Sequence, residues 1–586
     1  MRAIMLMFDT LRRDMLPNYN KNIKNMPNFK RLEMHSVKFN NFYAGSLPCM
    51  PARRELHTGR LNFLHRSWSP LEPFDDSIFE IMKNNNIYSH LITDHQHYWE
   101  DGGATYHNRY SSYEFVRGQE GDLWKADLNF KEHTKLNKYN IAEKFRKNMV
   151  YHDEVNRSYM RNEEDYPQSK CIQLGIEFID KNHNCDNWYL QVENFDPHEP
   201  FYVPNRFKEM VDPSLIDSEY DWPEYTYVDD IDNNEKLIKW KQNYLALMYM
   251  CDEYLGKILD KLDEYNMWED TMLIVNTDHG FLFGEKEWSG KSVMPVYNEL
   301  AHTPFFIWDP NSKLKNKETD ELAQTPDIAL TLLKHFNLDK TKDMTGKPIQ
   351  NILNNNQKNH SEILFGYFGG HVCITDSKYV YMRGSKNINN EPLYEYTLMP
   401  TRMRRRFDIN DFSYVELSEP LSFTKGMKVL KVKSKSEFYS SYSHGNLLFD
   451  LTSDPNQEHS ILDYDKEKEF INKLIKKLSE NDAPKDEYIR LGLDINKTFT
   501  YENVKSEKTE REENLKHILK GFYNKNLNIN IKTLLLNIAY QTSEEYISEL
   551  YEILQHIDKI NKIDIFNAYK QLNKFDNLNY LFQIKY

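Results

Sequence analysis

Four short apolar segments of this chain are each followed closely by acidic or imidazole side chains. The segments cover residues 3–8, 87–93, 188–193 and 271–275. They lead into Asp9, Asp94-His95, the stretch that contains His198, and Asp278-His279. In parallel α/β sheets, ligands bind at the carboxyl ends of the strands. The sequence therefore predicts a parallel sheet whose strand ends carry one shared polar site.

The spacing of apolar residues predicts helices between these strands. Residues 26–32, 75–83 and 169–180 have helical periodicity, and an apolar stripe from Leu237 to Leu262 predicts one long helix. We therefore expect an α/β fold with a large, mostly parallel sheet flanked by helices.

The length of 586 residues predicts more than one domain. We expect a catalytic α/β domain over residues 1–370 and a smaller α+β subdomain with an antiparallel sheet over 371–495. A helical C-terminal extension is expected over 496–586. Strands are predicted at 372–383 and 429–432, and a capping box at Thr542–Glu545 precedes an apolar helical stripe in the extension.

Charge and cysteine content exclude some classes of protein. The net charge of -14 argues against a nucleic-acid-binding surface. The five cysteines are scattered, without zinc spacing or a disulfide framework, which favours a reducing compartment. We find no leader-like segment and no apolar run of membrane-spanning length. We therefore expect a cytoplasmic protein that does not bind membranes.

The segment from Ser46 to Arg60 carries the most specific pattern in the chain. Pro51 suits the first turn of a helix, so Cys49 is expected at or just before a helix N-terminus, where free backbone N–H groups attract anions. Arg53, one turn later, points back towards Cys49 and can bind an oxyanion through its planar fork. The alternative is a capping turn with an ordinary buried thiol.

Cys49, Pro51, Arg53 and Thr58-Gly59-Arg60 together resemble the signature of the sulfatase family. In that family the cysteine is oxidised to formylglycine, an aldehyde that hydrates to a geminal diol. The resemblance extends over about residues 1–495. It implies an alkaline phosphatase/sulfatase-like fold, and a maturation enzyme that makes the formylglycine.

The resemblance also implies roles for residues at the strand ends. Asp9, Thr10, Cys49, Asp278 and His279 would bind one divalent metal, with Ca²⁺ as the first expectation and Mg²⁺ or Mn²⁺ as alternatives. Thr10 departs from the second aspartate that sulfatases commonly carry. The chemistry fits because oxygen-rich coordination with one imidazole suits these ions better than zinc.

Further residues would bind and process the ester. Arg53, Lys291 and His95 would share the sulfate, although sulfatases have a lysine where His95 stands. His198, in a Pro-His-x-Pro-Phe element, would protonate the leaving group, and His97 would remove a proton from the remaining hydroxyl. We expect His95 and His97 to face one site because alternate residues at a strand end point the same way.

Alternatives without a catalytic role stay open for these residues. Asp9 could be a cap or turn residue, and His95 and His97 could be a surface pair. His198 could be a turn residue without a role, and Lys291 could be a solvated surface charge. Arg402, Arg404, Arg405 and Arg406 form a basic cluster that either contacts a charged substrate or is a solvated loop.

The expected reaction is hydrolysis of a small-molecule or saccharide sulfate ester. One alternative is a phosphonate monoester or phosphodiester hydrolase, because the Asp-His-Gly sequence at 278–280 is more typical of those relatives. A non-catalytic binder of sulfated sugars is another. The extension is expected to be able to form a homo-oligomer.

Overall fold

A computed structural model describes residues 1–129, 144–231, 233–355, 357–434 and 441–522. The chain divides into two compact units. The first contains residues 1–368 and 394–438, and the second contains residues 369–393 and the described part of 439–586. The domain boundaries expected near 370 and 495 remain predictions.

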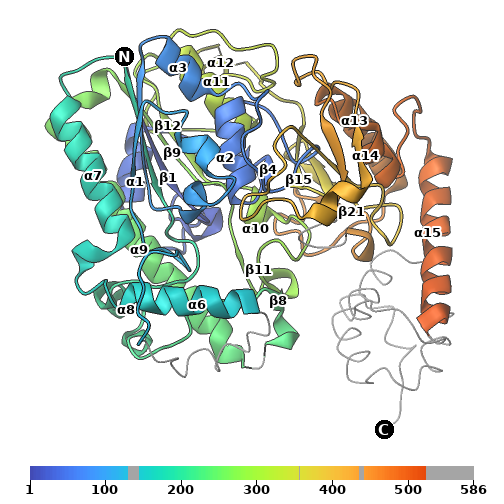
Figure 1. The fold of residues 1–586 in the computed structure, drawn as a ribbon, viewed down its shortest axis with the longest axis horizontal. Helices are drawn as coiled ribbons and strands as arrows, with labels where there is room; N and C mark the ends of the chain where they lie inside the picture. Colours follow the sequence, from blue (N-terminus) through green and yellow to red (C-terminus); the bar gives the residue numbers. More distant parts are fainter. Residues whose placement is uncertain (130–143, 232, 356, 435–440, 523–586) are drawn as a thin grey trace. The chain divides into compact units, whose positions relative to one another are not determined.

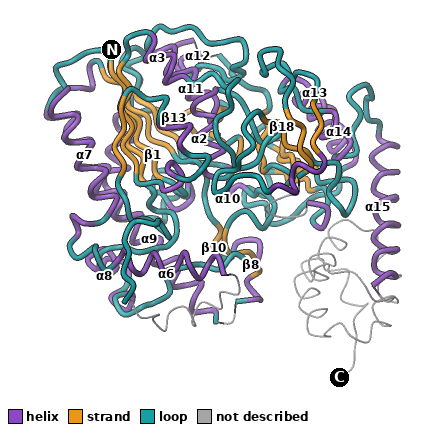
Figure 2. Tube along the Cα trace, in the orientation of Figure 1, coloured by secondary structure: helices purple, strands orange, loops and turns teal. Residues whose placement is uncertain are grey.

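The first unit is built on an eight-stranded sheet, visible as the largest group of strands in Figure 2. β9, β1, β7, β5 and β6 pair in parallel, whereas β12 is antiparallel to both β9 and β2. The predicted mostly parallel α/β sheet is therefore confirmed. In sheet order the strands are β13 (Lys317–Thr319), β2 (Val37–Phe39), β12 (Phe305–Trp308), β9 (Thr271–Asn276), β1 (Arg2–Phe8), β7 (Trp188–Asn194), β5 (Tyr88–Thr93) and β6 (Ser112–Phe115).

Helices cover both faces of this sheet because the central strand is apolar on both sides (Figure 1). Along β1, Ile4, Leu6 and Phe8 belong to one core cluster, and the residues between them belong to the other, as the alternation of a strand requires. The first cluster includes α1 (Pro27–His35), α7 (Pro167–Asn182) and α9 (Asn234–Glu264), and the second includes α2 (Cys49–Thr58), α3 (Ile78–Asn84), α11 (Thr325–His335) and α12 (Gln350–Asn355).

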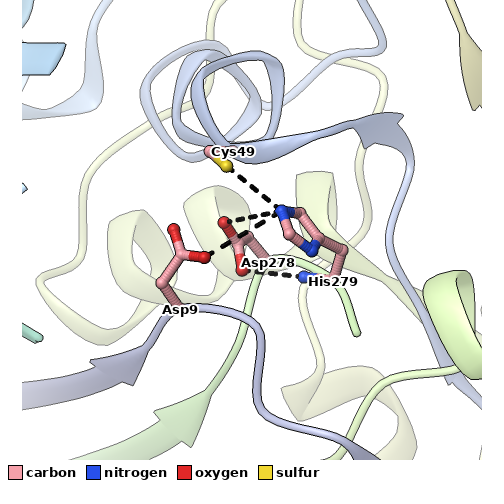
Figure 3. A group of neighbouring side chains, drawn as sticks. All are labelled: Asp9, Cys49, Asp278 and His279. Atoms are coloured by element: carbon pink, nitrogen blue, oxygen red, sulfur yellow. Dashed lines mark hydrogen bonds and ion pairs between the residues drawn. The ribbon is translucent and has the colours of Figure 1, made fainter. Parts of the chain in front are cut away.

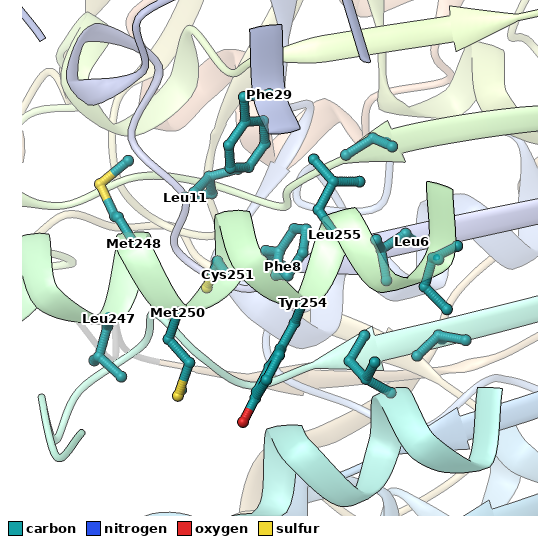
Figure 4. Packing of buried hydrophobic residues seen from close by; sticks show 14 of the residues in the cluster. Leu6, Phe8, Leu11, Phe29, Leu247, Met248, Met250, Cys251, Tyr254 and Leu255 are labelled. Carbon is teal, nitrogen blue, oxygen red and sulfur yellow. The ribbon is translucent and has the colours of Figure 1, made fainter. Parts of the chain in front are cut away.

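The long apolar stripe predicted at 237–262 lies on α9 and packs against the sheet. Figure 4 shows Met248, Cys251 and Leu255 of α9 beside Phe8 of β1 and Phe29 of α1. The helix begins after Asn233, whose side chain accepts a hydrogen bond from the backbone N–H of Glu235. The apolar periodicity therefore predicted this element, and the structure adds its cap.

Smaller elements complete the first unit. They include α4 (Ala104–His107), α6 (Lys144–Arg157), α8 (Asn205–Val211) and α10 (Asn298–Ala301). The short strands include β4 (Ser46–Leu47), paired with β15 (Ile363–Tyr367), and the antiparallel set β18 (Tyr394–Thr397), β20 (Leu430–Lys433) and β19 (Val415–Leu417).

Some sequence predictions were wrong in detail. The strand expected at 372–383 is a hairpin of β16 (Val372–Thr375) and β17 (Tyr379–Arg383), because the chain turns after Thr375. The helix expected from Asp75 begins at Ile78, where Ser77 caps it. His95 and His97 do not lie on a strand: β5 ends at Thr93, and a short 3₁₀ helix occupies Gln96–Trp99.

The second unit contains the strands predicted at 372–383, whereas the strand predicted at 429–432 is β20 of the first unit. β17 pairs with β16 and with β21 (Leu447–Asp450), and α13 (Tyr464–Glu480) and α14 (Lys485–Arg490) follow. Residues 501–522 form α15 (Tyr501–Phe522). The capping box predicted at Thr542–Glu545 lies outside the described residues. Within the described chain, every helix is too short or too polar to cross a bilayer.

Candidate active site

Four side chains from three distant parts of the sequence meet at the carboxyl end of the sheet (Figure 3). Asp9 follows β1, Asp278 and His279 follow β9, and Cys49 begins α2. One ligand atom from each lies within 4.8 Å of the others, and all four side chains are buried. The neighbouring positions of β1 and β9 explain the meeting, because parallel neighbours end at the same edge.

The local sequence places Cys49 at the start of its helix. Pro51 lies in the first turn, where its missing N–H costs no hydrogen bond. The helix ends at Gly59, which has φ +60° and donates its N–H to the carbonyl of Glu55 over 2.8 Å. A side chain there would also meet Leu330, so glycine is required. Burial, followed by the nearby Asp9, raises the pKa of the Cys49 thiol well above its ordinary value.

Arg53 connects the carboxylates beneath Cys49. Its Nη2 lies 2.8 Å from Asp9, its Nε donates to Glu193 over 2.9 Å, and its Nη1 donates to Asp278. Nη1 also donates to the Cys49 carbonyl, one turn back, over 3.0 Å, in the direction expected from the sequence. These partners occupy the whole guanidinium, so in this structure Arg53 organises the acids. Direct binding of an ester oxygen by Arg53 stays a prediction.

Arg53 also controls the charge of Asp9. Burial alone would raise the pKa of Asp9, but Arg53, together with neighbouring imidazoles, holds it well below the ordinary value. Asp9 is therefore an ionised carboxylate at neutral pH, as a metal ligand must be. The alternative that Asp9 is an ordinary helix cap has no support in these contacts.

The orientation of His279 fits a metal ligand. Its Nδ1 lies 3.0 Å from the carbonyl of Gly280, so Nδ1 carries the proton and Nε2 is left with a lone pair. That Nε2 lies 3.2 Å from Cys49 Sγ and 3.6 Å from an oxygen of Asp278. Burial lowers the pKa of His279, which keeps the imidazole neutral. Metal-bound histidines commonly donate their other N–H to a backbone carbonyl in this way.

Two carboxylates and one neutral imidazole can therefore hold a divalent cation beside Cys49. Gly280 permits the arrangement, because a Cβ at this position would come within 2.0 Å of the Glu299 carbonyl oxygen. The donor set fits a divalent cation, while the choice among calcium, magnesium and manganese stays a prediction.

Thr10 stands beside this donor set in a strained conformation. Its φ of +65° is uncommon for a β-branched residue. The backbone is held by an N–H bond to Asp278 (3.0 Å) and by Tyr244, whose hydroxyl donates to the Thr10 carbonyl over 2.8 Å. The Thr10 hydroxyl donates to Asp9 over 2.6 Å. Thr10 thus supports Asp9, and its predicted role as a metal ligand remains untested.

Lys291 lies beside Cys49 and Thr10. Lys291 is buried, and its Nζ lies 4.0 Å from Cys49 Sγ and 3.4 Å from Thr10 Oγ1. Burial opposes its charge, but Cys49, Glu199 and Asp9 raise the pKa of Lys291 above its ordinary value, so it is a cation. The alternative of a solvated surface lysine is wrong.

His198 is buried and neutral in this structure. Its Nδ1 bonds the carbonyl of Glu199, which leaves Nε2 for another partner. Burial and then the charge of Lys291 lower the pKa of His198 well below its ordinary value. The negative charge of a bound ester would act against both effects. The proton-donor role of His198 stays a prediction, and it would depend on substrate binding.

His95 and His97 lie in different surroundings although their rings are 4.9 Å apart. His95 Nε2 is 3.3 Å from Asp9, so it belongs to the buried cluster. His97 instead contacts Glu100 through Nδ1 (2.7 Å) and Arg404 through Nε2 (3.3 Å). Alternation along a strand is therefore the wrong reason for their closeness, because the 3₁₀ turn sends the two imidazoles to different partners.

Two glutamates in the site were missed by the sequence reasoning. Glu193 bonds Arg53 and accepts a hydrogen bond from Tyr98, and Glu199 lies 3.5 Å from Lys291. Burial raises the pKa of Glu199 to about 7. A signal existed for both: Glu193 is a charged residue in a buried strand, and Glu199 stands between His198 and Pro200.

Comparisons with known proteins agree with this geometry. A model of the sulfatase family matches residues 2–338, and one described as N-sulphoglucosamine sulphohydrolase, C-terminal, matches residues 284–428. The chain is 23% identical over 410 residues to an arylsulfatase of Clostridium perfringens. This alignment covers 64% of this chain and 83% of the relative.

Solved structures share the fold. A protein in complex with its substrate D-glucosamine-2-N,6-O-disulfate has a TM-score of 0.57 at 12% identity and covers 83% of this chain and 99% of that one. A phosphonate monoester hydrolase of Agrobacterium radiobacter has a TM-score of 0.54 at 16% identity, covering 82% and 96%. The resemblance seen in the sequence is confirmed. Because the family match spans more than half of its residues, this chain belongs to the sulfatase family of hydrolytic enzymes.

Proposed function

We propose that the protein hydrolyses a sulfate ester, using a formylglycine made from Cys49 and one divalent metal ion. The observation that carries this proposal is the meeting of Cys49 with Asp9, Asp278 and His279 at a helix N-terminus. The sulfatase family match supports the reaction class.

Asp9, Asp278, His279 and the modified Cys49 would hold the metal, with Thr10 beside them. When bound, the cation would polarise the ester's oxygens and compensate their charge. Formylglycine would supply a hydrated aldehyde with two hydroxyls. One would act as the nucleophile, and the other would allow the aldehyde to be regenerated. We propose calcium as the first candidate for the metal.

The remaining residues would position charge and protons. Lys291, a buried cation beside Cys49, would hold the negative ester group together with Arg53 and His95. His198 would present Nε2 to the leaving oxygen, because its Nδ1 is occupied by the Glu199 carbonyl. His97 would take the proton of the remaining hydroxyl, which requires its Nε2 to leave Arg404.

We propose a sulfated saccharide as the substrate. The match to the N-sulphoglucosamine sulphohydrolase C-terminal model supports a sugar sulfate, as does the structural neighbour solved with a glucosamine disulfate. The second candidate is a phosphonate monoester, supported by the likeness in fold to the Agrobacterium enzyme and by the Asp-His-Gly sequence. Turnover of an aryl sulfate and an aryl phosphonate by one preparation separates the two, and faster phosphonate cleavage would reverse our assignment.

Mass spectrometry of the peptide containing Cys49 tests the chemistry directly. Conversion to formylglycine exchanges sulfur for oxygen with loss of hydrogen, so we expect a lower mass when the maturation enzyme is co-expressed. A thiol that persists in an active preparation would contradict the mechanism. A thiol in an inactive protein that still binds sulfated sugars would support the non-catalytic alternative.

We also propose, from the sequence, a cytoplasmic location and an oligomer formed through residues 496–586. Gel filtration of the full chain and of a chain ending at residue 495 tests the oligomer. An unchanged association state after truncation would contradict it.

A further inference from the structure

One buried carboxylate contacts two side chains that the proposed function places around the ester. Glu199 Oε1 lies 3.5 Å from Lys291 Nζ, and Glu199 Oε2 lies 3.4 Å from His198 Nδ1. The Glu199 side chain is only 6% exposed, so water and salt screen these contacts little. The position of Glu199 therefore acts on Lys291 and His198 together.

Tyr225 fixes this carboxylate through a hydrogen bond and a close packing contact. Its hydroxyl donates to Glu199 Oε1. Its ring lies against Gly290, where φ is +106° and a Cβ would come within 2.8 Å of Tyr225 Cδ1. Because Gly290 directly precedes Lys291, Tyr225 contacts both the backbone beside the lysine and the carboxylate that pairs with it.

A small antiparallel sheet explains why these residues meet. In this sheet β11 (Trp288–Gly290) pairs with β8 (Thr226–Tyr227). Tyr225 directly precedes β8 and Lys291 directly follows β11, so the antiparallel register brings the two residues to the same end of the pair. The lysine and the anchor of its carboxylate are thus set by one structural element.

Lys291 needs an anchor because its side chain is long and flexible. Its contacts with Thr10 Oγ1 at 3.4 Å and with Cys49 Sγ at 4.0 Å are long for hydrogen bonds. Attraction to the Glu199 carboxylate limits the positions that the ammonium group can adopt. A group that is held in place before the substrate binds does not have to be ordered during the reaction.

We infer that Glu199 is a positioning residue, which aligns the Lys291 ammonium with the His198 imidazole. This inference rests on the proposed function, in which Lys291 holds the ester and His198 protonates the leaving oxygen. Misalignment should matter most when the departing alkoxide is strongly basic, because that oxygen depends most on the proton. The effect of Glu199 is therefore expected to grow as the leaving alcohol becomes a weaker acid.

Two aryl sulfates with different leaving groups test this role in the matured enzyme. 4-Nitrophenyl sulfate releases an acidic phenol, whereas phenyl sulfate releases a weakly acidic one. Glu199→Gln keeps the shape of the side chain and removes its charge. We expect kcat/KM for phenyl sulfate to fall about 10-fold or more, mostly in kcat, and that for 4-nitrophenyl sulfate to fall less than about 3-fold. In a Lys291→Met background the same change should have a smaller effect, because the two residues act together.

Glu467→Gln is the matched control, because Glu467 is a buried carboxylate of the second unit with the same two kinds of partner. Tyr381 donates its hydroxyl to Glu467 over 3.2 Å, and Lys508 Nζ lies 3.1 Å from it. This variant should leave the ratio of the two kcat/KM values unchanged. Equal losses for both substrates in Glu199→Gln, or full additivity with Lys291→Met, would overturn the positioning role.

Crystal structures of the wild-type protein and of Glu199→Gln give a readout that needs no activity. Lys291 Nζ should be displaced in the variant while the backbone of Tyr225 stays in place. An unmoved Lys291 and an unmoved His198 would also overturn the role. A matured wild-type enzyme that cleaves no sulfate ester would contradict the proposed function instead, and the two crystal structures would still test Glu199.

Discussion

The sulfur of Cys49 lies 3.2 Å from Nε2 of His279, although 230 positions separate the two residues in the chain. One residue starts a helix, and the other follows a buried strand on the far side of β1 from β7. Their contact places the Cys49 side chain beside a neutral imidazole and two carboxylates. The following predictions test how that arrangement is held and used.

Replacing Arg53 by methionine should destabilise the protein strongly. The change leaves Asp9, Glu193 and Asp278 buried without their cation, and loss of one partner of a buried ion pair costs about 3–5 kcal/mol. The midpoint of urea unfolding, measured with a chelator present so that no metal compensates, should fall accordingly.

Arg31→Met provides the control for Arg53. Arg31 also binds two carboxylates, Asp260 and Asp263, each over 2.6 Å, but at the surface. Exposed pairs contribute about 1 kcal/mol or less, so this variant should unfold near the wild-type midpoint. Similar shifts in the two variants would show that burial is not what makes Arg53 important.

Changing Thr10 to aspartate should tighten binding of the divalent metal by 10-fold or more. An additional carboxylate would stand beside Asp9, at the position where Thr10 now donates a 2.6 Å hydrogen bond. Aspartate also tolerates the positive φ of this position better than threonine does. Metal titration of both proteins checks this, and a weaker affinity in the variant would show that the threonine hydroxyl is the better partner.

Gln119 should be needed for activity because it joins the loops of two candidate site histidines. Its Nε2 donates to Asp94 over 3.0 Å and to Asp196 over 3.1 Å, and Asp94 also accepts from the Phe195 N–H over 2.7 Å. Gln119→Leu leaves two buried carboxyl groups with fewer partners, at a cost of about 1–3 kcal/mol each. We expect kcat/KM to fall at least 10-fold, with most of the change in kcat.

Gln168→Leu distinguishes positioning from simple destabilisation. Gln168 is also buried, but its amide donates to Cys251 in the helical core over 3.3 Å. This variant should lose stability while its kcat/KM stays near the wild-type value. A comparable loss of activity in both variants would refute a specific role for Gln119.

Protein stability should decrease below about pH 6.5 partly because of His57. Burial lowers the pKa of this imidazole to about 3, whereas in the unfolded chain it is near 6.5. Between these values the unfolded state binds the extra proton, so stability is lost as pH falls, at up to about 1.4 kcal/mol per pH unit. His57→Gln should flatten the dependence of unfolding free energy on pH between 6.5 and 5. An unchanged slope would mean that His57 is protonated in the folded protein.

Local patterns in the sequence determined the elements and the chemistry of their ends. The continuous apolar run of β1, the apolar stripe of α9 and the Pro51 and Gly59 signals define structures that form from neighbouring residues. In the sequence, polar residues follow the apolar runs of the buried strands directly. Asp9, Asp278 and Cys49 could therefore be predicted as site residues before their positions were known.

Only the tertiary structure decided which of these side chains meet and what each one contacts. Arg53 binds three acids because the order β9-β1-β7 brings Asp278, Asp9 and Glu193 to one place, and strand order is not encoded in any short segment. His97 turns to Glu100 and Arg404 because a 3₁₀ helix, not a strand, follows Thr93, and because a loop some 300 residues later packs there. The charge of each buried group likewise depends on neighbours that chain folding supplies. Burial alone would raise the pKa of Asp9, whereas the distant Arg53, together with neighbouring imidazoles, holds it well below the ordinary value.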